Sequence, residues 1–103
     1  MDKAKQAKLE AAGWAVGTPK AFLNLSNEDE TFIEMKVALA AALRQSRVAQ
    51  HLSQVAAAKR LQSSQSRVAK MELADKTVTV DLLIRSILKL GGTREMVAAA
   101  LAH

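Results

Sequence analysis

A short segment near the middle of the chain holds side chains that can hydrogen-bond to the edges of nucleic-acid bases: Gln65, Ser66, Arg67 and Lys70. A glutamine amide can form two hydrogen bonds with adenine, and Arg or Lys can pair with guanine. On a helix that begins after Ser64, with residues spaced 100° apart, Ser66, Arg67 and Lys70 face away from Val68 and Met71, and Gln65 lies at the helix tip. We therefore predict a helix with an apolar inner face and an outer face that contacts bases.

Basic residues are concentrated around that segment. The chain has net charge +5, from 15 Lys and Arg against 10 Asp and Glu. Residues 35–71 contain no acid, and their basic residues are Lys36, Arg44, Arg47, Lys59, Arg60, Arg67 and Lys70. The rest of the chain sums to −2. Charge alone fits either a solvated basic face or a phosphate-facing surface, and the hydrogen-bonding side chains within the stretch favour the phosphate-facing surface.

Other chemistry finds little support in the sequence. The absence of cysteine excludes disulfides, iron–sulfur clusters, zinc–thiolate sites and a cysteine nucleophile. There is no nucleophile–base pair, no metal-ligand spacing and no Gly-rich phosphate loop, so we expect no catalytic residue, no metal, no cofactor and no enzyme. An acidic cluster fits the positive N-terminus of a helix better than it fits a metal site; it consists of Glu28, Asp29, Glu30 and Glu34.

Composition places the protein among globular domains. Half of its 103 residues are apolar and 24% are charged. The longest apolar run, 37–43, is far shorter than the ~20 residues of a membrane span. The N-terminus shows no apolar secretory signal. We expect a cytoplasmic protein, associated with the nucleoid if it binds DNA.

Capping residues and apolar spacing predict helices only. Helices are expected over residues 2–12, 19–24, about 27–50, 54–61, 65–72, 80–90 and 94–102. The fold class is all-α, with an N-terminal helical extension over 1–26 and a main domain over 27–103. We expect these helices to bury, among others, Phe32, Leu39, Leu43, Leu83, Ile84, Ile87 and Leu88.

Three segments together resemble a known family: Leu52-Ser53-Gln54, Ala58-Lys59-Arg60-Leu61, and residues 64–72 with the sequence SQSRVAKME. They are similar to the lambda-repressor-like, or Xre-type, helix-turn-helix. The resemblance runs from Arg44 to Leu90. It implies a five-helix domain that binds double-stranded DNA sequence-specifically as a transcriptional regulator, usually a repressor. It also implies a homodimer on a near-palindromic operator.

The resemblance assigns roles to individual positions. The base-contacting positions would be Gln65, Ser66, Arg67 and Lys70. The phosphate-contacting positions would be Arg47, Ser53, Gln54, Ser64, Lys76 and Thr77. Arg47 and Glu72 also match a structural pair that tethers the first helix to the recognition helix. Apolar surface for the homodimer is expected on the C-terminal helices, at Ile87, Leu90, Val97 and Leu101.

Three positions depart from the family pattern. His51 and Gln62 stand where the family has glycine with positive φ, at a cost of about 1–2 kcal/mol each. Ala57 stands where the family has leucine. These departures motivate an alternative, namely a protein-interaction module on an Xre-like fold that has lost DNA binding.

The N-terminal residues carry a second, softer resemblance. Residues 13–18 and 22–26, followed by the helix-turn-helix, are similar to small HigA-type antitoxins, which bind a RelE-like toxin and repress their own operon. A free-standing or phage-type repressor would look the same, so a toxin partner is one of two open alternatives.

Overall fold

The computed structural model describes residues 26–102, which form five helices and no strand. They are α3 (Asn27–Ala49), α4 (Gln54–Arg60), α5 (Gln65–Glu72), α6 (Val80–Lys89) and α7 (Arg94–Leu101). The all-α fold class is confirmed. The helices expected over 2–12 and 19–24 lie outside the described residues, and the division at residue 26 stays a prediction. None of the described helices is long and apolar enough to cross a membrane.

Each helix begins after a serine or threonine whose hydroxyl oxygen accepts a backbone N–H three residues later. The capping residues are Ser26, Ser53, Ser64, Thr79 and Thr93, as the sequence predicts. At Ser26 the cap is reciprocal, because the Asp29 carboxylate accepts the Ser26 backbone N–H in return. These local signals mark where each described helix starts without reference to tertiary contacts.

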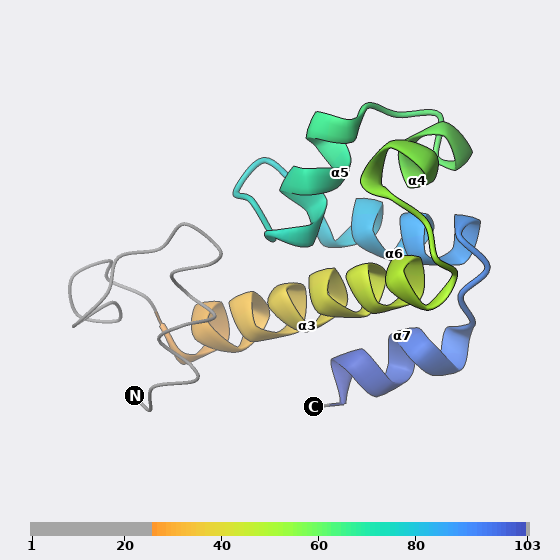
Figure 1. Cartoon of the computed structure of the whole chain (residues 1–103). Helices are drawn as coiled ribbons and strands as arrows, with labels where there is room; N and C mark the ends of the chain where they lie inside the picture. The colour runs from red at the N-terminus through yellow and green to blue at the C-terminus, as the bar shows by residue number, and fades with distance from the viewer. Residues whose placement is uncertain (1–25, 103) are drawn as a thin grey trace.

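The long helix α3 is the base on which the other helices pack (Figure 1). α6 and α7 lie against it, α5 touches it, and α4 pairs with α5. A short turn over residues 61–64 joins α4 to α5. The arrangement leaves α4 and α5 together on the side of the molecule away from α7 (Figure 1).

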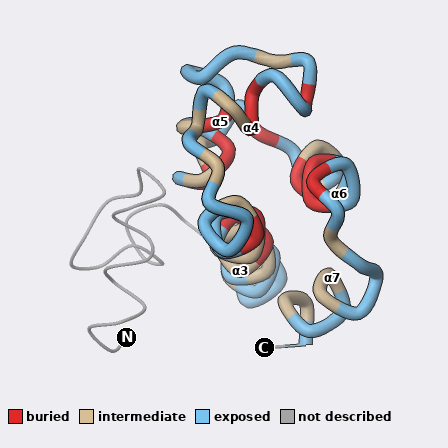
Figure 2. Tube along the Cα trace, turned by 45° about the vertical axis from the view of Figure 1, so that its right-hand side comes forward, coloured by how far each residue is buried: buried red, intermediate tan, exposed pale blue. Residues whose placement is uncertain are grey.

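One core holds the helices together. The faces of α3, α4, α5 and α6 that turn toward one another carry the buried residues (Figure 2). The most enclosed side chains are Leu39, Leu43, Val68, Met71, Leu83, Ile87 and Leu90. Val68 and Met71 are each 1% exposed, which confirms the predicted inner face of α5. Ala57, which stands where the family pattern has leucine, is fully buried in α4.

Two predicted core positions are wrong. Phe32 is 54% exposed, and its neighbour Ile33 is buried instead. The first turns of α3 extend past the other described helices (Figure 1), and neither Phe32 nor Ile33 belongs to the core cluster. Leu88 is 47% exposed. Because Leu83 and Ile87 already direct one face of α6 inward, Leu88 lies about 100° further round the helix.

The predicted apolar homodimer surface is also wrong at two positions. Ile87 and Leu90 are 0% and 2% exposed within the single chain. Val97 and Leu101 are partly buried against the same core. Ile87 and Leu90 therefore close the domain on itself, whereas the homodimer surface at Val97 and Leu101 stays a prediction.

Three helices end with a non-glycine residue at positive φ: His51 at 58°, Gln62 at 54° and Ala74 at 53°. The positive φ of His51 and Gln62 is confirmed as predicted, whereas the sequence analysis missed Ala74. Each end has the same pair of backbone hydrogen bonds, such as His51 N–H to Val48 and Leu52 N–H to Arg47. This pairing satisfies the last carbonyls of each helix. Gly91 ends α6 in the same way with the residue that this conformation favours.

We expect glycine to relieve strain at the two exposed positions. His51→Gly and Gln62→Gly should each raise the free energy of unfolding by about 1 kcal/mol, since neither side chain is packed. Urea denaturation measures the change. The control is Ala41→Gly, at an exposed position in the interior of α3, which should lower stability by about 1 kcal/mol. A loss of stability in both loop variants would show that these turns are not strained.

Candidate nucleic-acid interface

The outer face of α5 carries the four predicted base-contacting residues. Gln65, Ser66, Arg67 and Lys70 are all exposed, and Ser66 and Lys70 lie on the side opposite the buried Val68 and Met71. The Arg67 and Lys70 side chains have no hydrogen-bond or ion-pair partner among residues 26–102. This helix therefore presents donors and acceptors outward while its inner face anchors it.

A buried ion pair attaches α5 to α3. The Arg47 guanidinium donates to Glu72 from Nε, at 2.6 Å, and from Nη2, at 3.0 Å. Its Nη1 donates to the Leu52 carbonyl at 2.8 Å. The Arg47 and Glu72 side chains are only 13% and 5% exposed. The hydrogen bond to Glu72 raises the pKa of Arg47. The predicted structural pair is thus present as a two-point contact, which fixes the position of α5 relative to α3.

The Glu72 carboxylate is also the inner end of a chain of hydrogen bonds between two glutamine amides. Gln54 donates its Nε2 to Glu72 at 3.2 Å, and Gln65 donates its Nε2 to the Gln54 carbonyl oxygen at 2.7 Å. A carboxylate only accepts hydrogen bonds, so Gln54 must turn its amino group toward Glu72 and its oxygen toward Gln65. The direction of the whole chain follows from the charge at its inner end.

This direction sets what Gln65 can offer outward. With one N–H committed to Gln54, the Gln65 amide retains one N–H and its carbonyl oxygen. One donor beside one acceptor complements N7 and the N6 amino group of adenine in the major groove. Gln65 therefore keeps free the two kinds of group, one donor and one acceptor, that a contact with adenine needs.

A second group of predicted residues surrounds a shallow recess of about 250 Å³ between α5 and the loop that follows it. Its lining residues are Ser64, Ser66, Arg67, Lys70, Thr77, Val78 and Leu82. Ser53 and Ser64 use their hydroxyl oxygens as helix caps. Each hydroxyl keeps a proton that it can donate to a phosphate.

The loop between α5 and α6 is held from inside. Thr77 donates both its backbone N–H, at 3.0 Å, and its hydroxyl, at 2.7 Å, to one Asp75 oxygen. These hydrogen bonds lower the pKa of Asp75. The Lys36 amine reaches the Asp75 carbonyl from α3 at 2.8 Å, and burial lowers the pKa of Lys36. Thr77 has thus committed both donors internally, which leaves Lys76, exposed beside it, as the outward donor of this loop.

Arg47 has few free N–H groups with which to contact DNA. Three of its N–H groups are donated within the protein, and its side chain is mostly enclosed. Its burial favours the structural role over phosphate contact.

Sequence analysis missed a second polar tether. Gln50 donates to the Leu90 carbonyl at 2.6 Å, and Arg60 donates to the Gln50 oxygen at 3.1 Å. The ends of α3, α4 and α6 are thereby joined. Nothing in the spacing of Gln50 and Arg60 signals this, because the contact depends on how three helices converge.

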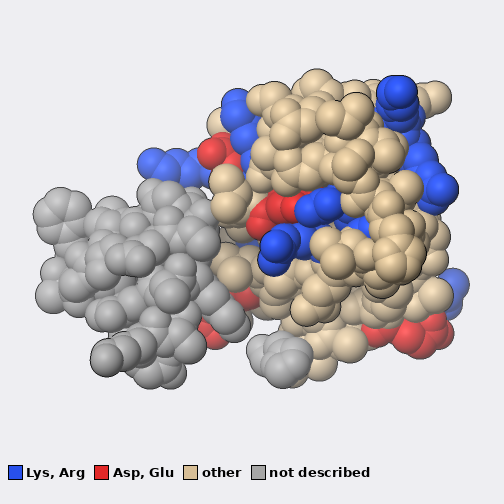
Figure 3. All heavy atoms as spheres, viewed as in Figure 1, with Lys and Arg blue, Asp and Glu red and all other residues tan. Residues whose placement is uncertain are grey.

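The basic surface follows α4 and α5. Figure 3 shows Lys and Arg side chains at the outer edge of the part of the molecule that these two helices form. The exposed basic residues of the acid-free stretch are Arg44, Lys59, Arg60, Arg67 and Lys70. Arg47 is paired with Glu72 within the fold, so its charge adds little to this surface. The surplus positive charge is therefore outward, where a polyanion can meet it.

A comparison with protein families decides what kind of motif this is. Residues 43–85 match the helix-turn-helix family model. The match spans the end of α3, all of α4 and α5, and the first half of α6, and so includes every residue proposed above to contact DNA. The helix-turn-helix is of the type found in DNA-binding regulators. No curated protein and no solved structure matches the chain. The HigA-type resemblance finds no support in these comparisons, and residues 13–25, on which it depends, lie outside the described residues.

We expect the Arg47–Glu72 pair to show strong coupling in stability. Arg47→Met and Glu72→Leu should each lower the free energy of unfolding by about 3–5 kcal/mol, because each leaves a buried charge unpaired. Removing both charges with Arg47→Met/Glu72→Leu should cost much less than the sum of the single changes. Urea denaturation of the single and double variants measures the coupling.

The matched control is the exposed Arg85–Asp81 pair, with side chains 74% and 75% exposed. Its loss should change stability by less than about 1 kcal/mol. Additive effects at Arg47 and Glu72 would contradict the role of this pair as a tether.

Proposed function

We propose that this protein is a sequence-specific double-stranded DNA-binding transcriptional regulator that acts as a repressor. The observation that carries the proposal is the Gln65 amide, held outward at the tip of α5 through Gln54 and Glu72. A solvated surface glutamine needs no oriented partners, whereas a side chain that selects a base does.

In the proposed complex, the N-terminal half of α5 enters the major groove. Gln65 pairs with adenine, and Arg67 and Lys70 contact guanine or nearby phosphates. On one side of α5, the start of α4 brings Ser53 and Gln54 to the backbone, and Gln54 keeps one free N–H for a phosphate. On the other side, Ser64 and Lys76 do the same. Occupancy of a promoter by this unit blocks polymerase.

One recognition helix contacts only about four or five base pairs, so the proposal includes a homodimer on a near-palindromic operator. Half-sites would then lie about 34 Å apart, one turn of DNA. Because Ile87 and Leu90 are buried in the core, the surface that joins two copies must lie elsewhere. The protein would act in the cytoplasm, at the nucleoid.

The alternative, an interaction module that has lost DNA binding, rested on the departures at His51, Gln62 and Ala57. The helix ends at His51 and Gln62 keep their full backbone hydrogen bonding despite positive φ, and Ala57 is enclosed in the core. The departures therefore cost stability without opening the motif, which favours DNA binding. Co-purification with a RelE-like toxin would add the antitoxin role, for which only the sequence resemblance speaks.

The test is selection of bound duplexes from a random DNA pool at about 150 mM salt. We expect wild-type protein to enrich a near-palindromic sequence. The double variant Gln65→Ala/Lys70→Ala should enrich a weaker or different one, since two base contacts are lost.

Lys59→Gln serves as the control, because it removes one charge from α4 outside the proposed base contacts. It should retain the wild-type sequence preference with a smaller salt dependence of binding. No enrichment, or equal salt-sensitive binding by all proteins, would contradict the proposal and favour an interaction module.

A further inference from the structure

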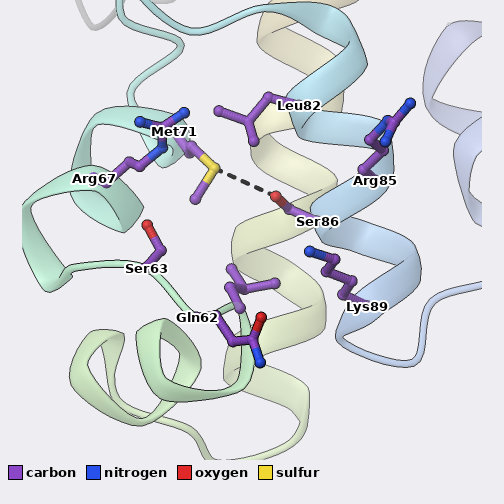
Figure 4. Close-up of a pocket in the computed structure, with 9 residues that line it drawn as sticks. Gln62, Ser63, Arg67, Met71, Leu82, Arg85, Ser86 and Lys89 are labelled. Carbon is purple, nitrogen blue, oxygen red and sulfur yellow. Dashed lines mark hydrogen bonds between the residues drawn. The ribbon is translucent and has the colours of Figure 1, made fainter.

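A recess behind the recognition helix shares only Arg67 with the proposed DNA contacts. It has a volume of about 310 Å³ and lies between α5, α6 and the turn that joins α4 to α5 (Figure 4). Its volume is at the lower end of the range for small-molecule sites. Its lining residues are Leu61, Gln62, Ser63, Arg67, Met71, Leu82, Arg85, Ser86 and Lys89.

The side chains that line the recess carry an excess of positive charge. Three basic residues line the recess and no acidic residue does. Arg85 is satisfied by Asp81, one turn earlier on α6, and its guanidinium points away from the recess in Figure 4. Lys89 extends from α6 toward the recess in the same view. Neither Lys89 nor Arg67 has a hydrogen-bond or ion-pair partner among the described residues, so two of the basic side chains that line the recess carry unpaired charge.

An unsatisfied hydroxyl lies in the same place. The Ser63 side-chain oxygen is buried and has no hydrogen-bond partner, alone among the buried side-chain polar atoms of residues 26–102. A buried polar group without a partner costs free energy, so such groups are rare in folded proteins. Ser63 lies across the recess from Lys89, on the α4–α5 turn (Figure 4). A bound acceptor would satisfy the hydroxyl and the two cations together.

The remaining lining is apolar or already satisfied. Leu61, Met71 and Leu82 supply apolar surface, and the Ser86 hydroxyl donates to the Met71 sulfur at 3.4 Å. A ligand that fits therefore has a small apolar body and one anionic group.

We propose that this recess binds a small organic anion, such as an aryl or alkyl phosphate or carboxylate. The anionic group lies between Lys89, Arg67 and the Ser63 hydroxyl, and the apolar body rests on Leu61, Met71 and Leu82.

Arg67 connects this recess to the DNA face. It lines both the recess behind α5 and the shallow recess beside the recognition residues. An anion in the rear recess competes with DNA for Arg67 and neutralises nearby charge, so it weakens DNA binding. The proposal that the recess binds an anion does not depend on the proposed function. The proposal that the anion weakens DNA binding does depend on the proposed function.

The probe is phenyl phosphate, which joins a phosphate to a small apolar ring. Titration into the ¹⁵N-labelled full chain, followed by backbone chemical shifts, should give saturable binding with a dissociation constant of about 1 mM or lower. The shifts should centre on residues 61–67 and 82–89. Phenol, which lacks the charge, and inorganic phosphate, which lacks the ring, should each bind at least about fivefold more weakly.

Two variants localise the site. Lys89→Gln should weaken phenyl phosphate binding at least about fivefold, and Ser63→Ala at least about twofold. The matched control Lys59→Gln removes one positive charge at an exposed position of α4 and should change phenyl phosphate binding less than about twofold. Absence of saturation, or equal weakening by Lys89→Gln and Lys59→Gln, would overturn the proposal.

An experiment with DNA distinguishes binding of a free small anion in this recess from binding of a phosphate of the DNA backbone. With a duplex obtained by selection, Lys89→Gln alone should leave DNA affinity within about twofold of wild type, and phenyl phosphate should weaken the wild-type complex more than the variant complex. If Lys89→Gln weakens DNA binding while phenyl phosphate fails to bind, the recess holds a DNA phosphate and the small-molecule site is refuted. If phenyl phosphate binds as described but no duplex is selected, the recess is supported and the regulator function fails.

Discussion

Arg47 and Glu72 lie almost out of solvent, and each charge is stable there because the other is present. Their contact joins α3, the longest element of the fold, to the last turn of α5. The same carboxylate holds Gln54, and Gln54 holds Gln65. A structural requirement, the pairing of a buried charge, thereby sets the orientation of an exposed amide two hydrogen bonds away. The proposed base selectivity depends on that orientation more than on the identity of Gln65 alone.

The turns around α4 and α5 show a different compromise. Three of the four helices that end in the left-handed conformation do so without glycine, at His51, Gln62 and Ala74. Each end still makes both of its characteristic backbone hydrogen bonds. The fold thus keeps the geometry of the motif and accepts a loss of stability of about 1–2 kcal/mol at each turn. The polar tethers from Lys36 to Asp75 and from Arg60 through Gln50 to Leu90 hold two of these turns against the rest of the domain.

Much of the fold could be predicted from local chemistry. Serine and threonine caps marked the start of every described helix, and apolar spacing identified Val68 and Met71 as inward. Phe32 and Leu88 were mistaken because helix periodicity does not reveal how wide the contacting stripe is, or where a long helix runs past its neighbours. Ile87 and Leu90 were mistaken because an apolar helix face covered by its own chain looks the same in sequence as one covered by a second copy. The Lys36 and Gln50 contacts depend on chain segments 39 and 40 residues apart, and no local pattern encodes them.

The central claim is that Gln54 orients Gln65 toward adenine, and base discrimination tests it most directly. Affinities would be measured for a selected duplex and for one with the base pair at the Gln65-dependent position changed from A·T to G·C. Wild type should prefer adenine by at least about fivefold. Gln54→Met, which preserves side-chain length, should reduce this preference below about twofold. The control Gln45→Met, at an exposed position of α3, should leave the preference intact. A uniform loss of affinity in Gln54→Met with unchanged preference would contradict the account, because Gln54 would then contact only phosphate.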